Sequence, residues 1–380
     1  MEKKKVLITY ATYGAGHKSV ATYIYDYFTK HSNFEIKIID LLDYENIIGK
    51  VSKKAFENNF KSNNGHIFFT AFYKLFNHKA TTFPYKLYAQ AILKNKKLKD
   101  EIVSFNPDLV ISSHFFGHII ASIYNKAGLI NTKIISIITD YASHEMWLKE
   151  KDSLDAIIVS NDIVANELIK KKIDKNKIYP YGIPILENFN QDIDINEVKK
   201  KYKVNNNKLT FLFFAGGSIG ASFTYNYLKE LLARKYDINI IFVCGKNEEV
   251  KERAEGLVKA EQYKNITILG FSNEVNKLLK ISDVVISKPG GLCLTECLEI
   301  KKPILVIPGS GGQEIDNAKF IYKNGYGINC NKSKKLSDVV GRLIKRPSIL
   351  NNLNKNLSKY ENNKSVEKIY DLSIKLLNEK

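Results

Sequence analysis

The chain has 380 residues and a formal net charge of +18, because 58 lysine and arginine residues outnumber 40 acidic ones. Hydrophobic residues make up 44% of the chain, a proportion that excludes a wholly disordered protein. No window holds 18 uninterrupted apolar residues, which argues against a membrane-spanning helix. The four cysteines are too few for a disulfide framework, so we expect a protein of the reducing cytoplasm.

Short apolar runs rich in isoleucine and valine alternate with helical stretches along the chain. Runs that are apolar on both faces predict strands buried under helices, and the alternation predicts parallel sheets of β-α-β units. The predicted strands are residues 5–11, 35–40, 109–112, 133–139, 156–159, 209–215, 239–244, 266–269, 284–287 and 303–307. The predicted fold class is therefore α/β, with two doubly wound, Rossmann-like parallel-sheet domains.

A polar stretch at residues 187–208 separates the two sets of strands and reads as a linker with a short charged helix. We place the boundary near residue 190. The predicted domains are residues 1–190 and residues 191–345. Helices without a strand signal follow at residues 346–380.

Positive charge is concentrated in residues 50–100, which hold eleven lysines and two acidic residues. Aromatic residues are interleaved with these lysines, among them Phe68, Phe69 and Phe72 beside Lys74. Aromatic rings that enter a membrane interface, with lysines that attract anionic lipid, are typical of a peripheral anchor. Core packing of the aromatics beneath solvated lysines explains the same pattern, and we expect both contributions. No nucleic-acid-binding motif is recognisable, so we expect no nucleic-acid partner.

Ligands of open α/β sheets bind beyond the carboxyl ends of the strands, where loops meet helix N-termini. In the first such loop, Gly14 and Gly16 permit a tight turn before His17, which could act as a general base or bind an anion. A helix-capping turn with an incidental histidine is the alternative. In the second domain, Gly216, Gly217 and Ser218 could cradle a diphosphate, or form an ordinary strand-to-helix turn.

Two further loops carry acidic residues. After Gly290 and Gly291, Glu296 lies among apolar neighbours and needs a partner, either a ribose diol or a nearby lysine. Gln313, Glu314 and Asn317 crowd the start of another helix, a pattern that suits sugar binding. Alternatively, Glu314 only complements the helix dipole.

Together these stretches resemble the glycosyltransferase family that makes monogalactosyl- or processive glucosyl-diacylglycerol. They are similar, more distantly, to the lipid-II-forming N-acetylglucosaminyltransferase. The resemblance covers about residues 5–330. It rests on Tyr13-Gly14-Ala15-Gly16-His17, Thr139-Asp140-Tyr141 with Trp147, Tyr181-Gly182-Ile183-Pro184, Gly216-Gly217-Ser218, Leu269-Gly270-Phe271, Lys288-Pro289-Gly290-Gly291 through Thr295-Glu296, and Gly312-Gln313-Glu314 with Asn317.

The resemblance implies a GT-B fold and an inverting transfer without a metal ion or other cofactor. It implies that residues 1–190 face the acceptor and the membrane, and that residues 191–345 bind the UDP-sugar donor. It implies that Glu296 binds ribose, the backbone near Phe271 binds uracil, Gln313 and Glu314 bind the hexose, and His17 lies at the acceptor hydroxyl. Asp140 is the second candidate for the base. The candidates for donor binding are Gly216, Gly217, Ser218, Phe271, Gly290, Gly291, Thr295, Glu296, Gln313, Glu314 and Asn317. The candidates for acceptor or membrane contact are Gly14, Gly16, Phe68, Phe69, Phe72, Lys74 and Trp147.

The predicted function is transfer of a hexose, glucose by preference, from a UDP-sugar to diacylglycerol or another lipid acceptor at the anionic cytoplasmic face of the cell membrane. A metal-dependent enzyme would need an Asp-x-Asp motif, and Asp192-Ile193-Asp194 falls in the predicted linker rather than after a strand. The alternatives are hexosamine transfer to a polyprenyl-linked acceptor, a sugar-nucleotide epimerase of the same fold, and a non-catalytic UDP-sugar sensor.

Overall fold

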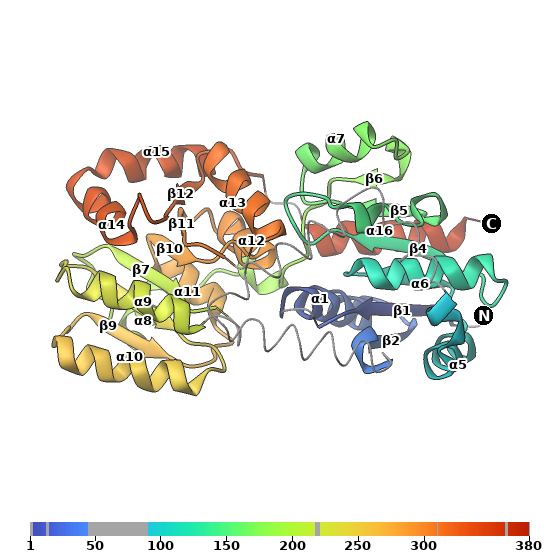
Figure 1. Ribbon diagram of the computed structural model, residues 1–380, viewed down its shortest axis with the longest axis horizontal. Coiled ribbons are helices and arrows are strands. Elements are labelled where there is room, and N and C mark those ends of the chain that lie inside the picture. Colours follow the sequence, from blue (N-terminus) through green and yellow to red (C-terminus); the bar gives the residue numbers. More distant parts are fainter. Residues whose placement is uncertain are drawn as a thin grey trace. The chain divides into compact units, whose positions relative to one another are not determined.

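The computed structural model of the chain describes residues 3–12, 15–44, 90–216, 221–309, 311–361 and 364–379 (Figure 1). These residues form two compact units. Described residues up to 185, together with 364–379, form the first unit, and residues 186–361 form the second. Each unit contains one six-stranded sheet in which every neighbouring pair of strands is parallel.

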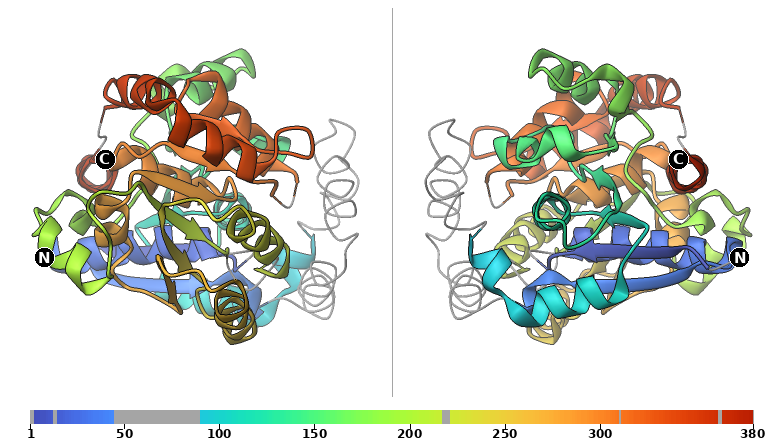
Figure 2. Two further views of the ribbon diagram at one scale, coloured as in Figure 1. Left: turned by 90° about the vertical axis from the view of Figure 1, so that its left-hand side faces the viewer. Right: turned by 90° about the vertical axis from the view of Figure 1, so that its right-hand side faces the viewer.

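The sheet of the first unit has the order β2-β1-β3-β4-β5-β6. Its strands are β1 (Lys5–Tyr10), β2 (Glu35–Asp40), β3 (Leu109–Ser112), β4 (Lys133–Ile137), β5 (Ala156–Ile158) and β6 (Ile178–Tyr179). Its helices are α1 (Ala15–His31), α5 (Lys96–Phe105), α6 (Phe115–Lys126), α7 (Asp162–Lys170) and α16 (Ser365–Asn378), with short 3-10 helices η1 (Leu41–Tyr44), η2 (Glu145–Leu148), η3 (Lys151–Ser153) and η4 (Lys175–Lys177). In the right-hand view of Figure 2, the blue strands β1 and β2 run between α1 and the cyan helix α5.

The second sheet has the order β12-β11-β10-β7-β8-β9. Its strands are β7 (Thr210–Phe214), β8 (Asn239–Val243), β9 (Ile266–Leu269), β10 (Val284–Ser287), β11 (Ile304–Val306) and β12 (Gly327–Asn329). The unit's helices are η5 (Glu187–Asn190), α8 (Ile195–Lys201), α9 (Ala221–Leu232), α10 (Glu248–Glu261), α11 (Val275–Ile281), α12 (Gly291–Glu299), α13 (Gln313–Lys323), α14 (Leu336–Lys345) and α15 (Pro347–Leu357).

Both sheets reverse their strand order beside their first strand. In the first unit the reversal falls between β1 and β3, and in the second it falls between β7 and β10. At such a switch point, the loops that leave the two strands diverge to opposite faces of the sheet and open a crevice for a ligand. Each unit therefore has one place where the topology favours a binding site.

The predicted α/β fold with two parallel sheets is confirmed. Every predicted strand is present, and the linker contains the expected short charged helix, α8. The strands β6 and β12 were not predicted. They are the edge strands of their sheets and have only two and three residues, too few for an apolar run to stand out.

The last helix, α16, belongs to the first unit although it ends the chain. It packs against α1, where the hydroxyl of Tyr370 donates a 2.6 Å hydrogen bond to the carbonyl oxygen of His31. The hydroxyl of Ser365 likewise donates to the carbonyl oxygen of Gly182 at 2.8 Å. The carboxyl end of the chain therefore completes the first unit.

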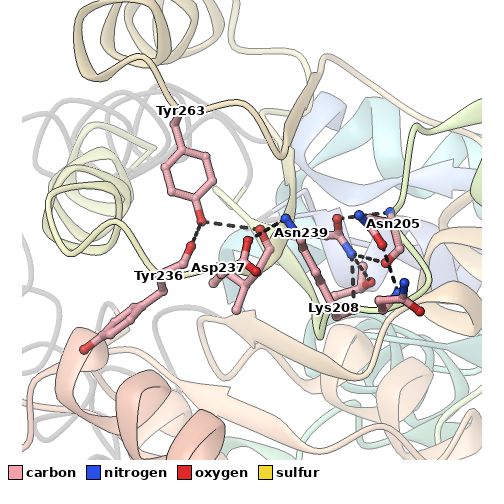
Figure 3. A network of polar contacts seen from close by, with 9 residues as sticks. Asn205, Lys208, Tyr236, Asp237, Asn239 and Tyr263 are labelled. Atoms are coloured by element: carbon pink, nitrogen blue, oxygen red, sulfur yellow. Dashed lines mark hydrogen bonds and ion pairs between the residues drawn. The ribbon is translucent and has the colours of Figure 1, made fainter.

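A polar network closes the amino end of the second sheet (Figure 3). Asn239 begins β8, and its Nδ2 donates to the carbonyl oxygens of Asn205 at 2.8 Å and Lys208 at 3.2 Å. Its Oδ1 accepts a 3.1 Å hydrogen bond from the amide of Asn205. The hydroxyl of Tyr263 donates to the carbonyl oxygen of Tyr236 at 2.6 Å. The buried amide of Asn239 thus holds the segment that enters β7, and the glycine-rich loops lie at the opposite, carboxyl end.

Candidate functional site

His17 lies in the first turn of α1, and Ser113 directly follows β3, so both residues lie at the switch point of the first sheet. The Nδ1 atom of His17 is 2.7 Å from the carbonyl oxygen of Ser113. The hydroxyl of Ser113 donates a 2.8 Å hydrogen bond back to the carbonyl oxygen of His17. These two contacts fix the start of α1 and the plane of the imidazole ring.

The same contact determines the tautomer of His17. A carbonyl oxygen can only accept a hydrogen bond, so Nδ1 carries the proton and Nε2 holds the free lone pair. A second oxygen, Oγ1 of Thr139, lies 3.1 Å from Nδ1. Burial lowers the pKa of His17 to about 4, although the hydrogen bond to Ser113 opposes this shift. The ring is therefore neutral at pH 7 and can accept a proton at Nε2.

His114 stands beside His17, with the two ring centroids 4.7 Å apart in an edge-to-face arrangement. Its Nδ1 accepts a 3.3 Å hydrogen bond from the amide of Phe116 and so caps α6. Burial lowers the pKa of His114 well below its usual value. His114 therefore packs against the candidate base as a neutral ring and adds no charge to its surroundings.

Trp147 lies in the core of the first unit and is only 2% exposed. Its ring centroid is 6.0 Å from that of His118 and 5.8 Å from that of His144. Burial lowers the pKa of these two histidines to about 4 and about 3. Trp147 therefore packs in the core at this end of the sheet, and its predicted contact with the acceptor or the membrane stays a prediction.

Asp140, the second candidate base, comes directly after Thr139 and is 7% exposed. It follows β4, so it lies at the same end of the sheet as His17. Gly16 is half-buried in the first turn of α1. The structure thus brings His17, Asp140 and Gly16 to one end of the first sheet.

In the second unit, Gly216 follows β7 and Lys288 follows β10, so both lie at the second switch point. A Cβ atom on Gly216 would lie 3.8 Å from both Cδ and Nζ of Lys288. A Cβ atom on Gly245, which follows β8, would lie 3.7 Å from the carbonyl oxygen of Gly216. Gly216 has a φ of 92°, which favours glycine. The loops after these three strands therefore meet around Gly216.

Glu296 is half-buried in the second turn of α12. Burial raises the pKa of its carboxyl well above the usual range, and Cys293 adds to the effect. Within the described parts of the chain, no lysine or arginine forms an ion pair with Glu296, so the predicted alternative of a nearby lysine partner is not found there. Thr295 is buried, and its hydroxyl donates to the carbonyl oxygen of Gly291 at 2.8 Å. The carboxyl group of Glu296 could therefore accept hydrogen bonds from a ligand at this helix start.

The loop after β11 is tied to the loop after β10 by Asn317. This side chain is fully buried, and its Nδ2 donates a 3.0 Å hydrogen bond to the carbonyl oxygen of Pro289. A Cβ atom on Gly309 would lie 2.1 Å from Oε2 of Glu314, so the Glu314 side chain folds back over that glycine. Gln313 is half-buried at the first position of α13. Asn317 thus holds the two loops together, whereas Gln313 and Glu314 lie at the helix start.

Phe271 lies just beyond β9 and is 62% exposed. The Nζ atom of Lys246 is 5.3 Å from the centroid of its ring. A Cβ atom on Gly270 would lie 3.7 Å from the carbonyl oxygen of Gly245, so the loops after β8 and β9 are neighbours. An exposed aromatic residue therefore stands at the same sheet end as Gly216 and Glu296.

The remaining candidates lie outside the described residues, and their predicted roles stay predictions. They are Gly14, Gly217, Ser218, Phe68, Phe69, Phe72 and Lys74.

No group of three or more His, Cys, Asp or Glu side chains could hold a metal ion among the residues that the structure describes. Oδ1 of Asp194 caps α8 by accepting hydrogen bonds from the amides of Asn196 and Glu197. The Asp192-Ile193-Asp194 sequence therefore belongs to the start of the linker helix. None of the helices in the described ranges combines the length and the apolar character that crossing a bilayer requires.

Three residues at these two sheet ends had no predicted role: Ser113, Thr139 and Lys288. The sequence feature that could have identified them is their position directly after a strand or shortly beyond it. The missing information was which strands are neighbours, because Ser113 and Thr139 come 96 and 122 residues after His17 in the sequence.

Two family models match consecutive parts of the chain. The model of monogalactosyldiacylglycerol (MGDG) synthase matches residues 17–185, and the model of the glycosyltransferase family 28 C-terminal domain matches residues 211–374. Among curated proteins, the processive diacylglycerol beta-glucosyltransferase of Bacillus subtilis is 28% identical over 93% of this chain and 90% of its own length. The enzyme of the same name from Bacillus pumilus is 29% identical over the same shares of the two chains.

Solved structures with a similar fold include MurG of Acinetobacter baumannii, with a TM-score of 0.62 and 15% identity over 98% of this chain and 99% of that one. They also include the UDP-GlcNAc 2-epimerase of Neisseria meningitidis, with a TM-score of 0.63 and 14% identity over 98% of this chain and all of that one. At these identities the likeness concerns the fold alone.

The two parallel-sheet units, with a candidate base in one and glycine-rich loops in the other, define a glycosyltransferase of the GT-B class. The chain belongs to the glycosyltransferases that join an MGDG synthase domain to a family 28 C-terminal domain. The family predicted from the sequence motifs is thereby confirmed.

Proposed function

We propose that this chain is an inverting hexosyltransferase that moves glucose from UDP-glucose to the free hydroxyl of diacylglycerol, forming a β-glucosyl-diacylglycerol. The observation that carries the choice of substrates is the similarity, over 93% of the chain, to two enzymes named processive diacylglycerol beta-glucosyltransferase. The geometry of His17 supports the reaction type, because a neutral imidazole with an available Nε2 suits proton abstraction from a hydroxyl.

In the proposed reaction, Nε2 of His17 takes the proton of the acceptor hydroxyl while the hydroxyl oxygen attacks the anomeric carbon. The bond between that carbon and the UDP oxygen breaks, and UDP leaves from the opposite face. An α-linked donor therefore gives a β-linked product. The charge that the ring gains is stabilised by the oxygens of Ser113 and Thr139 at Nδ1.

The donor is assigned to the second switch point. In this proposal the carboxylate of Glu296 accepts hydrogen bonds from the two ribose hydroxyls, and the backbone near Phe271 contacts uracil. Gln313 and Glu314 bind the hexose hydroxyls. Gly216, with Gly217 and Ser218, contacts the diphosphate.

We also propose that residues 50–100 attach the enzyme peripherally to the anionic cytoplasmic face of the membrane, where its acceptor is found. The support is their eleven lysines and interleaved aromatic residues. Binding to liposomes that contain anionic lipid should fall as salt rises, since salt screens surface charges. Binding that is insensitive to salt would contradict the electrostatic part of this attachment.

The direct test is to incubate the purified chain with diacylglycerol liposomes and a panel of UDP-sugars, and to analyse the lipids by mass spectrometry. We expect a hexosyl-diacylglycerol with UDP-glucose. A product formed only from UDP-N-acetylglucosamine and a polyprenyl-linked acceptor would favour the hexosamine transferase. Conversion of the sugar nucleotide without any lipid product would indicate an epimerase. Binding of UDP-sugar without conversion would indicate a sensor.

A further inference from the structure

A departing UDP gains negative charge on its diphosphate, and enzymes place cations or oriented amides where such charge develops. Lys288 is a cation that lies at the switch point of the second unit. It directly follows β10, and its Cδ, Cε and Nζ atoms run alongside Gly216, which follows β7. Its position therefore coincides with the crevice that the sheet topology opens for a ligand.

The surroundings of Lys288 favour an anionic partner. The side chain is half-buried, and burial lowers the pKa of its ammonium group. The negative charge of Glu314 opposes this shift. A diphosphate carries more negative charge than one carboxylate, so it would stabilise the charged lysine more strongly.

The neighbouring loop leaves room for such a ligand. A Cβ atom on Gly290 would meet nothing within 4 Å, and its φ of −71° is open to any residue. Neither packing nor backbone conformation therefore requires a glycine at this position. Gly290 is the N-cap of α12, whose first amides are oriented toward the same loop end. A small residue here keeps the approach to those amides open.

We propose that Lys288 is the cation that binds the diphosphate of the donor, and that phosphate oxygens take the place of the Glu314 carboxylate as its main anionic neighbour when the nucleotide binds. The inference rests on the proposed function, because it assumes a UDP-sugar in the second unit. The exchange leaves Glu314 to accept hydrogen bonds from the hexose. Lys288 then stabilises the charge on UDP as the glycosidic bond breaks.

The test compares the affinities of UDP and uridine, measured by calorimetry on the full chain. Lys288→Met should weaken UDP binding about tenfold to a hundredfold, the range for hydrogen bonds to charged groups, and leave uridine affinity unchanged. Lys288→Arg keeps the charge and should stay within a few-fold of the original affinity for UDP. The matched control is Lys319→Met, because Lys319 is exposed on α13 and pairs with Asp316.

A second variant tests the exchange and does not depend on the folding of Lys288→Met. Glu314→Gln removes the competing carboxylate, so the affinity for UDP, which lacks the hexose, should rise. Equal UDP affinity in Lys288→Met and the unchanged chain would overturn the inference, as would equal losses for UDP and uridine. Unchanged or lower UDP affinity in Glu314→Gln would overturn the exchange. A chain that never binds UDP would instead contradict the proposed function itself.

Discussion

The Nδ1 atom of His17 lies 2.7 Å from the carbonyl oxygen of Ser113, and this contact decides which nitrogen of the ring can act as a base. The two residues are brought together because β1 and β3 are neighbours at the point where the sheet reverses its order. The switch point of the sheet thus sets the tautomer of the His17 ring.

Replacing His17 by alanine should remove the base without touching the donor site. We expect glucosyl transfer to fall by a factor of about 10²–10⁴, the usual contribution of a general base, while UDP affinity stays unchanged. His31→Ala is the matched control, because His31 is exposed at the other end of α1. Steady-state rates and calorimetry on both variants give the comparison. Full activity in His17→Ala would shift the role of base to Asp140 or another group.

Thr139 should act through His17 and not on the substrate. Thr139→Val removes the oxygen 3.1 Å from Nδ1, and loss of one such hydrogen bond costs about 0.5–1.5 kcal/mol, or about twofold to thirteenfold in kcat. The oxygen stabilises the protonated ring, so its removal lowers the pKa of His17 further below about 4. The acid limb of the pH–rate profile should therefore move to lower pH.

The conservative variant Thr139→Ser keeps a hydroxyl and should restore both the rate and the profile. KM for the donor should change in neither variant. An equal effect of valine and serine, with no movement of the acid limb, would indicate a role in packing alone.

Binding of UDP should depend on pH through Glu296. Burial raises the pKa of this carboxyl in the free protein, and hydrogen bonds from two ribose hydroxyls would favour the charged form and lower it again. Affinity should therefore increase as pH rises through the raised pKa, with release of a proton on binding. Calorimetry in buffers of different ionisation enthalpy measures that proton. Glu296→Gln should bind UDP more weakly and with no such pH dependence; a pH dependence that survives in this variant would exclude Glu296 as its source.

Gly117 should be required for the close packing of α6 on the sheet. A Cβ atom there would lie 2.0 Å from Oγ1 of Thr9 and 2.2 Å from Oγ of Ser112, both buried. Overpacking of this kind costs about 1–3 kcal/mol, so Gly117→Ala should lower the free energy of unfolding by that amount. Gly256, in α10, has open space around its Cβ position, and alanine there should stabilise the protein by about 0.5–1 kcal/mol. Denaturant unfolding of the two variants should thus show opposite signs, and equal effects would contradict this account.

The elements of the fold could be predicted because both sheets are made of buried, parallel strands. Strands such as β3, β8 and β10 are buried at every position, so each appears in the sequence as an apolar run with one polar residue at its end. The edge strands β6 and β12 give no such run. The return of α16 to the first unit was also not predicted, because it depends on contacts with α1 that are distant in the sequence.

For the candidate site, the glycine-rich loops after predicted strands identified His17, Glu296 and Glu314 as residues at the carboxyl ends of the two sheets. The partners of those residues could not be found in the same way. Ser113 and Thr139 reach His17 from β3 and β4, and Lys288 lies against Gly216 because β10 pairs with β7. Strand order, which is a property of the whole sheet, determines these contacts.

The most direct measurement is a crystal structure of the enzyme with UDP. We expect the ribose within hydrogen-bonding distance of Glu296, the diphosphate at Lys288 beside Gly216 and Gly290, and uracil near Phe271. UDP bound anywhere other than beside Gly291 and Glu296 would contradict the account of the donor site and the mechanism that depends on it.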